Sequence, residues 1–379
     1  MQTIYQNNIL TNVSNLFLSD TYLKDWTLRS IRKGCRYSYE EISSLPFVKE
    51  NEKHTESIEL SSARTEELIN NYLFEYVGDS KRERTAEIVI GLPCGGKTTY
   101  LNKKDYTICD SDLIKRLMPE YDDGIGNERC HKASTIIFDK LIEELAYYGY
   151  NLGIPIIGKR IESFNKIYNV LIQNNYLIKV TYIKISKIES LNRALKRYLE
   201  ENRFVSLKYI NEINEKDIDD VYETVVNYPC VVEHNIILEE NTDTMNMYAV
   251  DVKCGHVGIN NYVVKTLVIP AINGKEAAEI ARYSPRVKHD HTDAIINVKK
   301  IGVIESARLN KINDEDKYFK CKCRREQRSI DLNLLYEDRE KKKYEKTGKY
   351  KKIKKHKLIE KDMLREINYY KTDLRLLYE

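Results

Sequence analysis

The chain has 379 residues, of which 42% are hydrophobic, and its net charge is +4 at pH 7. This length predicts two or three domains of about 100–200 residues each. The eight cysteines are scattered along the chain, so a disulfide scaffold is excluded as the basis of the fold. Residues 1–20 have no basic segment and no apolar core, and no apolar run is long enough to cross a membrane. We therefore expect a cytoplasmic protein with reduced thiols and no membrane contact.

Residues 1–84 are polar and carry short amphipathic helical patterns, the clearest at 66–74, so we predict an N-terminal helical extension. Strand and helix patterns alternate from 85 to 240. Predicted strands lie at 86–90, 106–109, 152–157 and 178–185, and predicted helices at 127–149, 161–174 and 187–201. This alternation predicts an α/β fold in which helices flank a parallel sheet. The alternating polar residues of the last strand place it nearer an edge.

The C-terminal part of the chain changes character twice. Residues 245–305 predict a small β-β-α-β module, and residues 306–379 predict a basic, mainly helical tail. The segment 341–358 holds ten lysines and one acidic residue, Glu345. Such a run either binds nucleic acid or another anionic surface, or it is a solvated helix face or disordered tail. Residues 1–84 are either a helical scaffold or an inhibitory segment that acts in cis.

The most specific motif is residues 91–98, GLPCGGKT, which match G-x-x-x-x-G-K-[ST] at every fixed position. The motif follows a predicted strand and precedes a predicted helix, so backbone N–H groups and the helix N-terminus would cradle phosphate. Lys97 would reach the β and γ phosphates, and the Thr98 hydroxyl would hold Mg²⁺. The alternative is a chance match in a glycine-rich turn. The predicted binding residues for ATP or GTP are Gly91, Leu92, Pro93, Cys94, Gly95, Gly96, Lys97, Thr98 and Thr99.

Two carboxylates and several arginines could complete a site beside this loop. Asp110 and Asp112 follow the second predicted strand, and ligands of open α/β sheets collect at the carboxyl ends of strands. One carboxylate can help hold Mg²⁺ while the other takes a proton from an acceptor hydroxyl. The alternative is a helix N-cap. Arg193, Arg197 and Arg203 either stabilise charge on a transferring phosphate or form a solvated basic face.

Over residues 60–240, this ordered set resembles the zeta-toxin family of P-loop kinases. The family's G-x-P-G-x-G-K-[ST] is matched with Cys94 in place of a glycine, and its I-D-x-D segment is matched by residues 109–112. Its lid helix is matched by residues 187–190 and 196–198. The resemblance implies that Asp112 is the general base and that Arg197 and Arg203 contact phosphate. Asp110 is then the carboxylate that would help hold Mg²⁺. It further implies phosphorylation of a nucleotide sugar such as UDP-N-acetylglucosamine, a role as a toxin, and an antitoxin partner.

The predicted strand at residues 151–160, NLGIPIIGKR, departs from the family pattern N-[IVL]-x-I-E-G-T-x-R. The glutamate is absent and Lys159 stands near the threonine position, so the resemblance implies the type of reaction more directly than the acceptor. Two other functions remain open. One is a nucleic-acid-end kinase or repair factor that uses the basic C-terminal half, and the other is a nucleotide-binding switch without turnover.

The small module carries Cys254 and His256 after one strand and His289 and His291 before another. Residues at i and i+2 of an extended chain face the same way, so the four side chains could close a tetrahedral zinc site. The alternative is a polar edge with an ordinary core cysteine. The spacing is not a standard zinc motif.

Overall fold

The computed structural model describes residues 16–51, 57–77, 81–124, 126–239, 244–254, 262–285, 287–288, 294–321 and 326. The chain divides into two compact units. We call Ser38–Thr242 the P-loop unit, and we call Met1–Tyr37 together with Asp243–Glu379 the discontinuous unit. The predicted boundaries kept residues 1–84 together, whereas the structure assigns the first part of that segment to the unit that also holds the C-terminal half.

The P-loop unit is built on one sheet with strand order β2-β3-β1-β4-β5. Every neighbouring pair is parallel, so the carboxyl ends of all the strands meet at one edge. This arrangement confirms the predicted P-loop α/β fold, with β4 one strand from the edge. The strands are β1 Thr85–Ile90, β2 Thr107–Ile108, β3 Leu152–Ile156, β4 Leu177–Lys184 and β5 Val231–Leu238.

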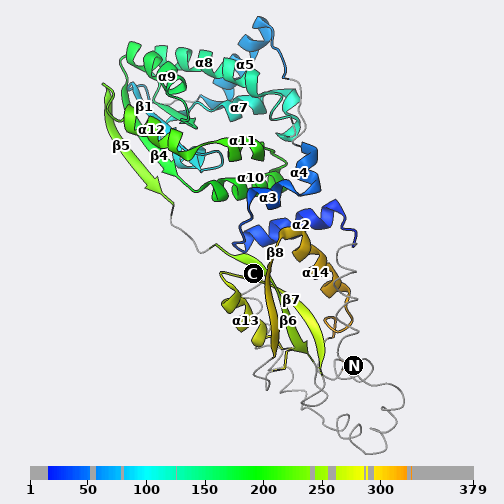
Figure 1. The fold of residues 1–379 in the computed structure, drawn as a ribbon. Coiled ribbons are helices and arrows are strands. Elements are labelled where there is room, and N and C mark those ends of the chain that lie inside the picture. Colours follow the sequence, from blue (N-terminus) through cyan, green and yellow to red (C-terminus); the bar gives the residue numbers. More distant parts are fainter. Residues whose placement is uncertain are drawn as a thin grey trace, which may run out of the picture. The chain divides into compact units, whose positions relative to one another are not determined.

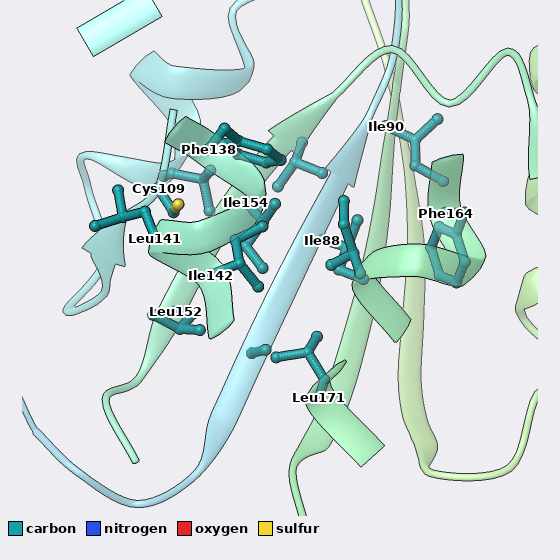
Figure 2. Packing of buried hydrophobic residues seen from close by; sticks show 14 of the residues in the cluster. Ile88, Ile90, Cys109, Phe138, Leu141, Ile142, Leu152, Ile154, Phe164 and Leu171 are labelled. Atoms are coloured by element: carbon teal, nitrogen blue, oxygen red, sulfur yellow. The ribbon is translucent and has the colours of Figure 1, made fainter. Parts of the chain in front are cut away.

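The core of the P-loop unit lies around β1, where Ile88 and Ile90 are fully buried. Two long amphipathic helices, α8 (His131–Tyr147) and α9 (Ile161–Gln173), present apolar residues at helical spacing toward these strands. Figure 2 shows this packing, to which β1, β3, α8 and α9 contribute. Side-chain packing and the hydrogen bonds of the sheet therefore both hold β1 in place. The loop that follows β1 begins at a rigid position.

The remaining helices of the P-loop unit are mostly short, and several begin at a side-chain cap, as at Ser38, Ser61 and Ser186. They are α3 Tyr39–Ser43, α4 Pro46–Asn51, α5 Ser62–Tyr76, α6 Lys97–Leu101, α7 Ser111–Arg116, the 3₁₀ helix η1 Pro119–Gly124, α10 Lys187–Glu201, α11 Leu207–Glu212 and α12 Glu215–Val225. Within this unit, α5 and α7 pack against α8, and α3 packs against α10 and α11 (Figure 1).

The discontinuous unit contains an antiparallel sheet of order β7-β6-β8. Its elements follow the predicted β-β-α-β order, and a further helix follows them. The elements are α2 Asp20–Arg32, β6 Asn246–Cys254, β7 Val263–Ala271, α13 Gly274–Arg282, β8 Ile295–Ile301 and α14 Val303–Glu315.

Residues from the two ends of the sequence join within this unit. The Trp26 indole of α2 donates to Ser306 Oγ of α14 at 2.9 Å. Met245 N donates to the Gly34 oxygen at 3.2 Å, and Arg36 N donates to the Met245 oxygen at 3.1 Å. These contacts explain why α2 belongs to the unit formed by the later strands. Across the part of the chain that the structure describes, no helix has both the length and the apolar character needed to span a bilayer.

Candidate active site

The P-loop runs from the end of β1 to the start of α6. A Cβ atom at Gly91 would lie 2.4 Å from the backbone oxygen of Ile183, so only glycine fits where the loop leaves the sheet. Gly96, the cap residue of α6, has a φ of 85°, and Cys94 has a φ of 56°. Left-handed residues in such a loop allow successive backbone N–H groups to face an anion. The loop therefore has the backbone features of a phosphate-binding turn.

Lys97, the first residue of α6, lies against its own loop. Its ammonium donates to the carbonyl oxygen of Gly91 at 2.8 Å and to that of Leu92 at 2.7 Å. Burial lowers the pKa of Lys97 to about 8. The charge is thus held inside the curve of the loop, which is where the lysine of this motif meets phosphate.

Asp110 joins the end of β2 to the P-loop. Thr98 Oγ1 donates to Asp110 Oδ2 at 2.8 Å, and the other carboxylate oxygen caps α7 by accepting from Asp112 N at 2.9 Å. Burial raises the pKa of Asp110, and the nearby charge of Asp112 raises it further. A hydroxyl and a carboxylate side by side are the oxygen donors that Mg²⁺ prefers, so these two residues fit a magnesium ion. The capping and metal-binding interpretations therefore apply to the same side chain.

Asp112 lies in the first turn of α7 between two cations. Lys115 Nζ lies 3.1 Å from Oδ1, and Arg203 pairs with Oδ2. Both cations are 4% exposed, whereas the Asp112 side chain is 37% exposed. Burial by itself raises the pKa of Asp112, but Lys115 and Arg203 outweigh it and hold that pKa well below its usual range. The carboxylate is therefore ionised near neutral pH, as a group that accepts a proton must be.

The lid helix α10 is attached to the P-loop at two points. Ser190 Oγ donates to the Pro93 oxygen at 2.7 Å, and Arg197 Nη1 lies 3.8 Å from Cys94 Sγ. Cys94 is the residue that replaces a glycine of the family motif. The structure therefore brings Arg197 to the loop itself, as the predicted phosphate contact requires.

Arg193, on the same helix as Arg197, has different partners. Its guanidinium lies 2.8 Å from Glu189 and also pairs with Glu239. Two carboxylates thus neutralise Arg193, while Arg197 reaches the loop and Arg203 reaches Asp112. Of the three arginines singled out in the sequence, the structure groups Arg197 and Arg203 with the other predicted site residues.

A polar cavity of about 290 Å³ lies beside the chain that follows β3. In it the Lys159 ammonium stands 4.3 Å from the centre of the Tyr209 ring. This region follows the carboxyl end of a strand, where open α/β sheets bind their ligands. The cavity is lined by Lys159, Arg160, Tyr209, Glu212, Ile213, Asn214 and Asp217.

Sequence reasoning missed three side chains that support the site. Tyr72 of α5 donates to the Ile108 oxygen at 2.6 Å and so ties the end of β2 to a helix far away in sequence. Asn127 contacts Lys115, and Ser190 contacts the P-loop. Ser190 belongs to the lid-helix match and could have been found there. Tyr72 and Asn127 carry no local signal, because their partners are distant along the chain.

The predicted zinc site stays a prediction. Cys254 is buried in the core of the discontinuous unit, while His256, His289 and His291 lie outside the described residues. The lysine-rich run at 341–357 lies outside them as well. Within the described ranges, no group of three or more His, Cys, Asp or Glu side chains could hold a metal ion.

A parallel sheet with a P-loop after its central strand, and paired carboxylates after a neighbouring strand, is the arrangement of a P-loop NTPase-like α/β fold. Residues 77–253 match the family model described as Zeta toxin, a family of P-loop kinase-like phosphotransferases. The chain therefore carries a zeta-toxin family domain, as the resemblance implied.

No curated protein matches the chain. A solved structure from the PezAT chromosomal toxin–antitoxin system of the human pathogen Streptococcus pneumoniae is similar at 16% identity and a TM-score of 0.40. The similarity covers 48% of this chain and 80% of that one, and at this TM-score it supports no statement about function.

Proposed function

We propose that the P-loop unit transfers the γ-phosphate of ATP to a hydroxyl group of a small acceptor. The observation that carries this proposal is the group at the carboxyl edge of the sheet. Thr98 donates to Asp110 beside the P-loop, and Asp112 lies next to them, ionised between two buried cations. A P-loop alone binds a nucleotide, whereas a carboxylate base beside it provides for an acceptor that must lose a proton.

In the proposed reaction, the acceptor oxygen bonds to the γ-phosphorus while the bond to the β–γ bridging oxygen breaks, and ADP leaves. The hydroxyl proton passes to Asp112. Lys97 and the loop amides hold the phosphates, and Arg197 and Arg203 stabilise the charge on the transferring oxygens. Mg²⁺ held by Thr98 and Asp110 would neutralise part of the phosphate charge.

The family resemblance supports a nucleotide sugar, such as UDP-N-acetylglucosamine, as the acceptor. The segment 151–160 lacks the glutamate of the family pattern, and Lys159 stands near the threonine position. Polar contacts with the acceptor would therefore come from other residues, and Lys159 and Tyr209 line a cavity at the same edge of the sheet. The same family resemblance supports a role as a toxin and an antitoxin protein as a partner, and we include both in the proposal.

The test is incubation of the purified chain with γ-labelled ATP and a panel of nucleotide sugars, nucleosides and RNA ends, followed by mass spectrometry. We expect UDP-N-acetylglucosamine to gain one phosphate, and Asp112→Ala to lower the rate by about 10²–10⁴-fold. If only RNA ends were labelled, the nucleotide sugar would not be the acceptor, and a nucleic-acid kinase would be favoured. Nucleotide binding with no transfer to any acceptor would contradict the proposal and favour a switch.

A further inference from the structure

Lys115 is a buried lysine to which the proposed reaction gives no part. It is 4% exposed, although lysine is among the residues least often buried. The next residue on the same helix, Arg116, is exposed. Burying an ammonium group is unfavourable unless the group is paired and hydrogen-bonded, because burial removes it from water. The position of Lys115 therefore calls for partners that offset this cost.

The partners of Lys115 come from two directions. Its ammonium donates to Asp112 Oδ1 at 3.1 Å and to Asn127 Oδ1 at 3.1 Å. Asn127 is itself buried, and its Nδ2 donates to the Phe204 oxygen at 2.9 Å. The two contacts fix the orientation of the Asn127 amide, since its oxygen must face the lysine and its nitrogen the carbonyl. Lys115 thus links the candidate base to the segment that carries Arg203.

The two oxygens of Asp112 are consequently not equivalent. Lys115 holds Oδ1 from within the same helix, one turn further on, and is itself held by Asn127. Arg203 pairs with Oδ2 from a segment that follows the lid helix. The proposed function has Arg203 contact the phosphate, which would leave Oδ2 free while Lys115 still holds Oδ1. The oxygen that is left to take a proton then has a fixed direction.

We propose that Lys115 is a positioning residue for the phosphoryl transfer, which orients the Asp112 carboxylate so that Oδ2 receives the acceptor proton. This inference rests on the proposed function, because it requires Asp112 to be the base. Lys115 touches neither nucleotide nor acceptor in this scheme. Its effect on the rate passes entirely through Asp112, and that property can be measured.

The test is a double-mutant cycle on the full chain. Initial rates are measured as phosphate release from ATP with water as the acceptor, and in parallel as transfer to UDP-N-acetylglucosamine. Lys115→Met should lower kcat by about 10–100-fold, a part of the 10²–10⁴-fold that a general base contributes. The KM for ATP should stay within about twofold, since uniform binding is unaffected. In the Asp112→Ala background, Lys115→Met should change kcat by less than about twofold.

Two further variants guard against a purely structural effect. Lys115→Arg keeps the charge and a donor and should recover most of the lost kcat. Arg116→Met removes a positive charge from the exposed face of the same helix and should leave kcat unchanged. Thermal unfolding of each variant shows whether the fold survives. In a crystal structure of the Lys115→Met variant, the Asp112 carboxylate should be rotated.

The outcomes separate the inference from the proposed function. If Asp112→Ala keeps full activity, Asp112 is not the base, and both fall. If Asp112→Ala is inactive but Lys115→Met leaves kcat and the carboxylate orientation unchanged, only the role of Lys115 falls. Multiplicative losses in the double variant would also overturn it, because they would show that Lys115 acts independently of Asp112.

Discussion

Glu87 is a charged residue inside the central strand of the P-loop unit, and its removal should cost considerable stability. Its side chain is 1% exposed. The carboxylate accepts hydrogen bonds from Tyr100 at 2.8 Å, Thr181 at 2.7 Å and the Lys104 ammonium at 2.7 Å. Glu87→Ala would remove all three contacts and leave a cavity beside β1.

The size of this effect depends on which partners can regain water. Removing one member of a buried ion pair costs about 3–5 kcal/mol, mostly because the other charge stays buried. The Lys104 side chain is 36% exposed and can be rehydrated, whereas the Thr181 hydroxyl is buried. We therefore expect a loss of about 2–4 kcal/mol in the free energy of unfolding for Glu87→Ala. Glu87→Gln keeps neutral hydrogen bonds and should lose about 1–2 kcal/mol.

The measurement is urea unfolding at pH 7, followed by far-UV circular dichroism. The chain has one tryptophan, and Trp26 lies in the discontinuous unit, so its fluorescence gives an internal control. Glu233→Ala on β5 is a matched variant, because the carboxylate of Glu233 pairs with Lys179 but is 60% exposed. That exposed pair should contribute about 0–1 kcal/mol. A Glu87→Ala cost no larger than the Glu233→Ala cost would refute the reasoning.

The same residue gives a pH dependence with a definite sign. Burial by itself raises the pKa of Glu87, but the hydrogen bonds from Lys104, Thr181 and Tyr100 outweigh it and lower that pKa in the folded protein. A lowered folded-state pKa stabilises the protein above the unfolded pKa, about 4.3, and this contribution is lost as the pH falls through the folded value. The stability difference between wild type and Glu87→Ala should therefore shrink in acid below about pH 4.

Three other predictions concern the loop and the second unit. With a pKa of about 8, Lys97 loses its charge in mild alkali, so calorimetric affinity for ATP should fall above that pH in the wild type but not in Lys97→Arg. Gly91→Ala places a Cβ 2.4 Å from the Ile183 oxygen and should lower the free energy of unfolding in urea by about 2–4 kcal/mol. At Gly96 a Cβ would meet no atom within 4 Å. Gly96→Ala should therefore cost only about 1–2 kcal/mol, from its positive φ. Trp26→Ala should destabilise the discontinuous unit by about 3–5 kcal/mol. Hydrogen exchange should show unchanged protection of the backbone amides in the P-loop unit.

The P-loop and the carboxylate pair could be predicted because their signals are local. The residues from Gly91 to Thr98 lie within one turn, and the first strand and the following helix fix its direction. Asp110 follows a strand directly, so the parallel topology alone carries it to the same edge of the sheet. In the structure the P-loop follows β1 and Asp110 follows β2, at the same edge of the sheet.

Contacts between distant segments could not be predicted in the same way. Nothing near Lys115 in the sequence indicates that Asn127 will contact it, or that Asn127 will in turn reach the Phe204 oxygen. The Trp26–Ser306 contact joins residues from the two ends of the chain, and only the tertiary fold shows that α2 belongs with α14. β5 gave no clear strand signal because the polar residues 233–235 interrupt its apolar residues, so the segment shows neither a regular alternation nor an unbroken apolar run.

The discontinuous unit has a consequence for the order in which the protein is made. Residues 16–37 are synthesised before the P-loop unit, but their partners, Met245 and α14, are synthesised only after it. At about 5–20 residues per second, this delay amounts to roughly 10–40 s. We expect the P-loop unit to complete its sheet during that interval, while the apolar side of α2 around Trp26 awaits its partners and is open to chaperones. A nascent chain would then carry the folded P-loop unit before α2 has packed against α14.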